Sequence, residues 1–160
     1  MKKFTLNLKK VCFFSVGLAF IILSSFDLPE EETFFIQTFL TKYYDNDAQI
    51  GGVKRYEINV TNTGFCRYRK IFINGKEEYF AFNLSRFKNM DYYGTTTKGD
   101  LYLRTKNDDV IVQTRNDNSG EIDSMGTYLV IPLKNVDVVQ LIELADRFKK
   151  VNGFLLASNK

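Results

Sequence analysis

The pattern of apolar and polar residues changes twice along the chain and divides it into three parts. The first ten residues carry four lysines and no acid, and residues 11–26 contain no charged residue. A basic stretch followed by an apolar one is typical of a secretory signal. A helix over 11–26 would rise about 24 Å, short of the ~30 Å hydrocarbon core of a bilayer. The pattern therefore favours a removable signal peptide at 1–26. The residues before Ser24 and Ser25 fit a cleavage site poorly, so an uncleaved anchor stays open as the alternative.

Both alternatives place the rest of the chain on the same side of the membrane. The lysines of the N-terminal segment stay inside, and the remainder of the chain is exported. We therefore expect an extracytoplasmic protein that is periplasmic, secreted or anchored in the membrane and facing outward. It would meet a membrane only through this segment, and only if the segment remains uncleaved.

Residues 27–52 are predicted to form an aromatic helical lead-in and a loop. Glu30, Glu31 and Glu32 follow Pro29, which is the arrangement of a helix start. The residues after them are also good strand formers, but their spacing favours a helix. The apolar face of this helix is expected to consist of Phe35, Ile36, Phe39, Leu40 and Tyr43.

From Val53 the apolar pattern has a period of two, which is typical of half-buried strands. About six antiparallel strands are expected, and Asn74-Gly75 is a strong hairpin signal between two of them. We interpret the stretches 89–94 and 116–123 as connections. A final helix is expected after a cap at Asn135, with Gly153 just past its end. Its apolar stripe is predicted to be Val138, Leu141, Ile142, Ala145 and Phe148.

These elements predict an α+β fold: one mainly antiparallel β-rich domain at 53–160, closed by a C-terminal amphipathic helix. The order of elements in 53–151 resembles the pleckstrin-homology-like barrel, and a split sheet with helices on one face is the runner-up. Phosphoinositide-binding members of that family use a lysine on the first strand and a basic-x-basic pair on the second. Lys54 and Arg67-Tyr68-Arg69 fall in those places. The tryptophan usual on the family's C-terminal helix has no counterpart, because the chain contains no Trp. An exported domain would also not meet the lipids of the cytoplasmic leaflet.

Charge and cysteine content change this picture only slightly. The chain has a net charge of +3, but without residues 1–26 there remain 18 Lys and Arg against 19 Asp and Glu, a net charge of −1. Nucleic-acid binding needs clustered excess positive charge, so we expect no nucleic-acid partner. Of the two cysteines only Cys66 lies outside the N-terminal segment. Packing, and not an internal disulfide, must hold the domain together.

The residue inventory excludes most catalytic chemistry. The chain has no histidine, which removes Ser-His-Asp and Cys-His systems and zinc sites that use histidine. It has no glycine-rich phosphate loop either. We therefore predict no catalytic residue, no cofactor and no metal site, and a protein that is not an enzyme. A small metal-independent hydrolase remains as an alternative. Its carboxylates would come from Glu57, Glu77, Glu78, Asp91 and Asp100.

One loop offers oxygen ligands of the kind that calcium prefers: Asp117, Ser119, Glu121 and Asp123. Its glycine comes too early for an EF-hand, at Gly120, and Tyr128 stands where the closing glutamate would be. We interpret this loop as a plain connection between strands.

A contact function is the interpretation that remains. The stretch 89–94 carries Met90, Tyr92 and Tyr93, residue types that are enriched at interfaces. Adjacent residues of an extended chain point to opposite sides, so at most one of the two tyrosines should pack inward. Arg67 and Arg69 share one face of a predicted strand and form a second candidate contact. We predict an exported non-enzymatic module of the bacterial envelope that binds a protein or a glycan. The alternative is an inhibitor or immunity-type protein that blocks a toxic partner outside the cytoplasm.

Overall fold

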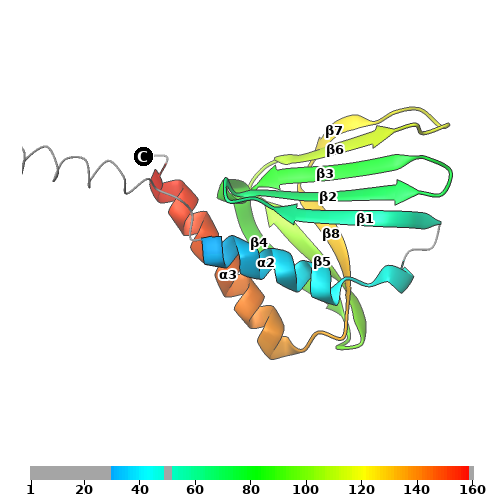
Figure 1. Cartoon of the computed structure of the whole chain (residues 1–160). Coiled ribbons are helices and arrows are strands. Elements are labelled where there is room, and N and C mark those ends of the chain that lie inside the picture. Colours follow the sequence, from blue (N-terminus) through cyan, green and yellow to red (C-terminus); the bar gives the residue numbers. More distant parts are fainter. Residues whose placement is uncertain (1–29, 49–51, 159–160) are drawn as a thin grey trace, which may run out of the picture.

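A computed structural model describes residues 30–48 and 52–158 of the chain; the expected signal or anchor at 1–26 lies outside the described residues. The described part is an α+β fold, as predicted, with two antiparallel sheets and a C-terminal helix (Figure 1). Its elements, in chain order, are α2 (Glu30–Tyr43), η1 (Asn46–Ala48), β1 (Val53–Val60), β2 (Phe65–Phe72), β3 (Glu77–Asn83), η2 (Leu84–Arg86), β4 (Phe87–Gly94), β5 (Lys98–Thr105), β6 (Val110–Arg115), β7 (Asp123–Gly126), β8 (Tyr128–Lys134) and α3 (Val138–Ser158).

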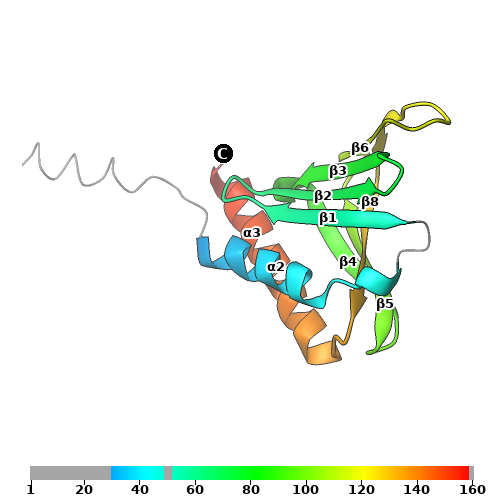
Figure 2. The ribbon, with the colours of Figure 1, turned by 45° about the vertical axis from the view of Figure 1, so that its right-hand side comes forward.

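The two sheets differ in size and cross each other. The five-stranded sheet has the order β1-β2-β3-β6-β7, and the three-stranded sheet has the order β4-β5-β8. The strands of the smaller sheet run across those of the larger one (Figures 1 and 2). As a result, one end of the larger sheet extends past the smaller sheet, and residues of both sheets line a cleft at this corner.

The described residues contain eight strands, two more than the pattern predicted. The stretch 89–94, which the sequence pattern indicates as a connection, belongs to β4 and pairs with β5. Its Asn, Asp and Gly residues are poor strand formers and conceal the alternation of Met90 and Tyr92 toward the core. The strand β7 has four residues and no alternation of apolar and polar residues, so its sequence does not predict a strand.

The helix α2 is the lead-in helix that the spacing predicted. It buries Ile36, Phe39 and Leu40. The side chain of Gln37 also protects the open edge of β1: its amide donates to the Ile58 carbonyl and accepts from the Val60 N–H, each at 2.6 Å. Because unpaired backbone groups at a sheet edge invite pairing with other chains, this side chain protects part of the outer edge of β1.

The predicted apolar stripe of the C-terminal helix is wrong in its first turns. Val138 and Ile142 are 64% and 58% exposed, and the buried residues of α3 are instead Leu144, Phe148, Val151 and Leu155. Both sets have helical spacing, so periodicity alone does not choose between them.

The predicted ends of that helix are wrong as well. The cap is Asp137, whose carboxylate accepts from the Gln140 N–H while the Gln140 side chain accepts from the Asp137 N–H, a capping box. Asn135, the expected cap, has a left-handed backbone with φ of 57°. The helix also continues through Gly153 to Ser158.

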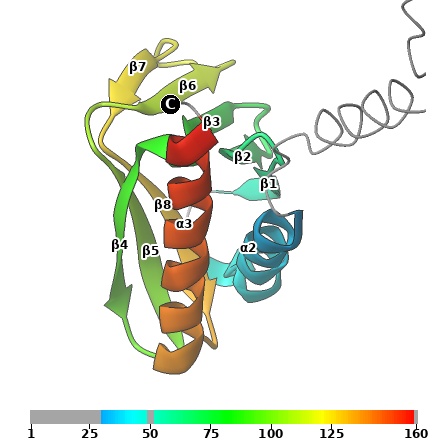
Figure 3. The same cartoon turned by 90° about the vertical axis from the view of Figure 1, so that its left-hand side faces the viewer.

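The core is formed by one face of the smaller sheet together with the larger sheet, which contributes Tyr68 and Phe82, and the two helices. Its buried side chains from β5 and β8 are Leu101, Leu103, Leu129, Ile131 and Leu133. They belong to the same cluster as Leu144 and Phe148 of α3 and Ile36 of α2, and Figure 3 shows α3 lying along this sheet. Among the described residues, no helix has the length and apolar character needed to cross a membrane.

Candidate functional site

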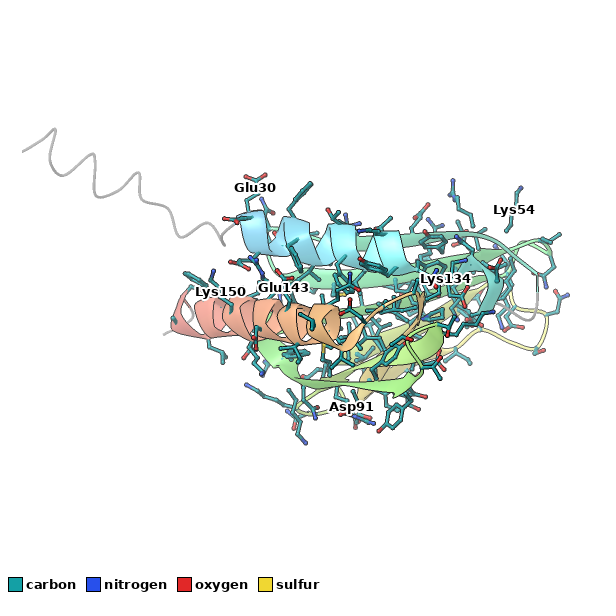
Figure 4. All side chains as sticks on the ribbon, turned by 90° about the horizontal axis from the view of Figure 1, so that it is seen from below. Glu30, Lys54, Asp91, Lys134, Glu143 and Lys150 are labelled. Atoms are coloured by element: carbon teal, nitrogen blue, oxygen red, sulfur yellow. The ribbon has the colours of Figure 1, made fainter. Side chains whose placement is uncertain are left out.

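The face of the smaller sheet opposite the core carries aromatic and charged side chains. Tyr102 and Arg104 alternate with the buried Leu101 and Leu103 of β5 and therefore point the other way. The register places Asp91 beside Tyr102, Tyr93 beside Asp100, and Tyr128 beside Arg104. Figure 4 shows Asp91 on the side of the sheet away from both helices. We call the group Asp91, Tyr93, Tyr102, Arg104 and Tyr128 the tyrosine face.

The three tyrosines form a row across β4, β5 and β8. The ring of Tyr102 lies at the centre, with its centroid 5.1 Å from that of Tyr93 in an edge-on arrangement and 5.5 Å from that of Tyr128. These are distances at which aromatic pairs attract each other. Tyr93 and Tyr128 are nevertheless 57% and 47% exposed. The row therefore presents ring surface to solvent in a fixed arrangement.

Arg104 holds this row together. Its guanidinium carbon lies 5.5 Å from the ring centroid of Tyr102 and 5.7 Å from that of Tyr128, within the range of cation–π attraction. Its Nε donates to Oδ2 of Asp91 at 2.6 Å. The guanidinium is charged at any physiological pH, and hydrogen bonds to Asp91 and Tyr93 raise the pKa of Arg104 further.

Next to the tyrosine face, the overhanging end of the larger sheet forms a cleft of about 370 Å³ with the smaller sheet. Val130 and Pro132 pair with Tyr102 and Asp100, so the floor of this inter-sheet cleft is continuous with the tyrosine face. The larger sheet supplies the opposite wall. The cleft is lined by Ala48, Val53, Tyr68, Lys70, Phe72, Glu78, Asp100, Val130 and Pro132.

The charges of the cleft are mostly paired. Glu78 accepts from Lys70 at 3.1 Å and lies 3.2 Å from the ammonium group of Lys76. Asp100 takes part in no ion pair between residues that the structure describes. The cleft thus offers one unpaired carboxylate next to a largely neutral surface.

The structure brings four of the five carboxylates considered for a hydrolase together in two pairs, of which one lines the inter-sheet cleft. Glu78 and Asp100 line the same cleft, whereas Asp91 binds Arg104 and both Glu57 and Glu77 bind Arg69 on the opposite face of the larger sheet. A carboxylic-acid catalyst has to be protonated when the reaction begins. Glu78 forms ion pairs with two lysines, which does not suit it to this role, so Asp100 would have to be the acid.

The five predicted contact residues do not form one site. Tyr93 is exposed on the tyrosine face, while Tyr92 and Met90 point to the other side and pack against the core. The Tyr92 ring lies over Gly99, where an added Cβ would come within 2.5 Å of it. Tyr92 also donates from its hydroxyl to the Thr95 carbonyl at 2.9 Å. Tyr92 and Met90 therefore have structural roles.

Arg67 and Arg69 lie on the outer face of the larger sheet. Arg69 binds Glu77 at 2.7 Å and Glu57 at 3.4 Å, and it lines a hollow of about 420 Å³ with Tyr79, Gln113 and Arg115. The residues that join Tyr93 are instead Tyr102 and Tyr128. Each alternates with buried leucines, which places it on a polar face, but only the pairing of the strands shows that they meet.

The calcium-like loop binds protein groups. Asp117 lies 2.8 Å from the ammonium group of Lys76 and accepts from the Ser119 N–H, and Asp123 accepts from Gln113. In the described ranges, His, Cys, Asp and Glu side chains form no group of three that could hold a metal ion. Cys66 is fully buried, and burial raises the pKa of its thiol to about 12. It is therefore not a nucleophile.

Comparisons of the chain with models of protein families, with curated proteins and with solved structures found no match.

Proposed function

We propose that this protein is a non-enzymatic contact module that works outside the cytoplasm and binds a protein or glycan partner on the tyrosine face. One observation carries the proposal: Tyr93 and Tyr128 expose about half of their surface although Tyr102 and Arg104 hold their rings in place. Tyrosine gives large contact area for few rotatable bonds. Rings that are already ordered lose little further entropy on binding.

Two further features support the proposal. The N-terminal segment has the layout of an export signal, which would put the tyrosine face in contact with the envelope or its surroundings. The packing of α3 also leaves this face free, because the helix covers the opposite side of the same sheet. For the fold, the resemblance to a pleckstrin-homology-like barrel stays a prediction.

A metal-independent hydrolase is the second candidate, since Glu78 and Asp100 line one cleft. We favour the contact module because the two lysines at Glu78 hold it as an ion pair. The two functions differ in whether a bound ligand is cleaved.

Co-purification tests the contact function. We expect the full chain, tagged at its C-terminus and extracted from the envelope in mild detergent, to carry a bound partner that the Tyr93→Ala/Tyr128→Ala variant loses. The matched control is Val138→Ala/Ile142→Ala, which removes equally exposed side chains from α3 and should keep the partner. The control positions are exposed and without such contacts, so each control change should alter the free energy of unfolding by less than about 0.5 kcal/mol. Each tyrosine change also removes a ring contact and should cost about 0.5–1.5 kcal/mol, so circular dichroism must confirm that the tyrosine variant is folded. A tyrosine variant that folds and keeps the partner would contradict the proposal.

A further inference from the structure

The chemistry of the site favours one of the two proposed partner classes, a glycan over a protein. Building on the proposed contact function, we infer that the tyrosine face and the inter-sheet cleft bind a neutral saccharide chain. The inference rests on the arrangement of the rings, on the charges and on the shape of the site.

The rings form a strip. Tyr93, Tyr102 and Tyr128 come from three adjacent strands, which at a spacing of ~4.8 Å extends the row over roughly 10 Å. A sugar ring presents C–H groups on its face, and these pack on the electron-rich face of an aromatic ring. A row of exposed rings suits a chain of several sugar units better than a single small molecule.

The charges disfavour an anionic ligand. Asp91 is neutralised by Arg104, and Glu78 by Lys70 and Lys76. Asp100 is the carboxylate of the site left without an ion pair between described residues. An unpaired carboxylate accepts hydrogen bonds from hydroxyl groups, which sugars supply in number. The same carboxylate repels phosphates and acidic peptides.

The shape of the site favours a narrow ligand over a protein surface. The cleft, at about 370 Å³, lies within the range of roughly 300–1,000 Å³ that is usual for small-ligand sites. A stable protein interface needs about 800 Å² on each partner. The overhanging larger sheet stands over this corner of the molecule (Figures 1 and 2) and would obstruct so broad a surface. In our inference the end of a sugar chain enters the cleft and the rest lies along the tyrosines.

Binding of defined oligosaccharides tests the inference. The probes are unbranched tetrasaccharides of glucose, mannose and N-acetylglucosamine, with tetragalacturonate as the anionic counterpart. The full chain is kept in a detergent without a sugar head group. Because the chain has nine Tyr and no Trp, its intrinsic fluorescence comes from tyrosine alone and includes the three rings of the tyrosine face. Saturation-transfer NMR shows which sugar protons lie against the protein.

We expect at least one neutral probe to bind saturably and to remain intact, and tetragalacturonate not to bind. Tyr128→Ala should weaken binding about tenfold, as expected for the loss of one ring contact. Asp100→Asn should also weaken it, because an amide offers a poorer acceptor. Tyr79→Ala, on the outer face of the larger sheet, should leave the affinity unchanged.

Several results would overturn the inference: no neutral probe binds, tetragalacturonate binds as well as the neutral probes, or Tyr128→Ala has no effect on affinity. If the co-purified partner is a protein and is lost with the tyrosines, the contact function stands and the saccharide inference fails. If the partner does not depend on the tyrosines, the contact function itself fails. If the wild-type protein cleaves a probe and the Asp100→Asn variant does not, the protein is a hydrolase and the contact function is wrong.

Discussion

Truncating Phe148 to alanine is expected to lower the free energy of unfolding by about 3–5 kcal/mol, the usual cost of a large-to-small change in a core. Phe148 is fully buried on α3 and stacks on Phe87 of β4, with the ring centroids 5.1 Å apart. It joins the helix to the sheet that carries the tyrosine face on its other side. The loss should appear as a lower midpoint of urea denaturation followed by circular dichroism.

Ile142→Ala is the matched control for this prediction. Ile142 lies on the same helix but is mostly exposed, so its truncation should change the stability by less than about 0.5 kcal/mol. If Ile142→Ala proved as costly as Phe148→Ala, the helix would pack through its other face and the described core would be wrong.

The second large effect concerns the buried carboxylate of Glu32. This residue lies in the first turn of α2, where the helix dipole favours negative charge. Arg147 of α3 donates to it at 3.0 Å, and Lys150 donates to its other oxygen. Figure 4 shows Lys150 at the end of α3 that lies near the start of α2. The carboxylate therefore ties the two helices together.

Burial by itself raises the pKa of Glu32, but hydrogen bonds from Lys150 and Arg147 outweigh it and leave the pKa below its ordinary value of 4.5. The unfolded chain therefore binds this proton more tightly than the folded protein does. The stabilisation by Glu32 is fully present above about pH 4.5, and it is lost as the pH falls through the lower pKa of the folded state.

Glu32→Gln, which keeps the size of the side chain, should accordingly reduce the stability at pH 7 by about 1.5–3 kcal/mol, the range for hydrogen bonds to charged groups. The difference from the wild-type protein should shrink as the pH is lowered below about 4.5. Urea titrations at several pH values measure both effects. Glu31→Gln, at an exposed neighbouring position, should show neither. A constant difference between Glu32→Gln and wild type across this range would mean that the charge of Glu32 does not stabilise the fold.

Local sequence patterns correctly predicted the helices and strands whose apolar residues all lie on one face. The lead-in helix has a single apolar face, and the alternation around Tyr56, Ile58 and Val60 defined β1. The α3 helix has apolar residues on two faces. The sequence therefore predicted that this segment is a helix, but not which of its faces is buried. Only contacts with the sheets decide that Leu144 is buried and Ile142 exposed.

The candidate site was harder to predict because it is made by strand pairing. The alternation rule correctly implied that one of Tyr92 and Tyr93 would face outward. The row needs Tyr102 and Tyr128 as well, and they come together through the register of β4 with β5 and of β5 with β8. The inter-sheet cleft depends further on how the two sheets cross. Neither the register of the strands nor the crossing of the sheets can be predicted from a local sequence pattern.

Photo-crosslinking in intact cells tests the central claim most directly. A benzophenone amino acid replaces Tyr93 in the full chain. In a second variant it replaces Val139, which is more exposed than Tyr93 but lies on α3, behind the opposite face of the sheet. If the tyrosine face is the contact surface, irradiation should give discrete adducts from position 93 and none from position 139. Equal adducts from both positions, or adducts from position 139 alone, would contradict the account.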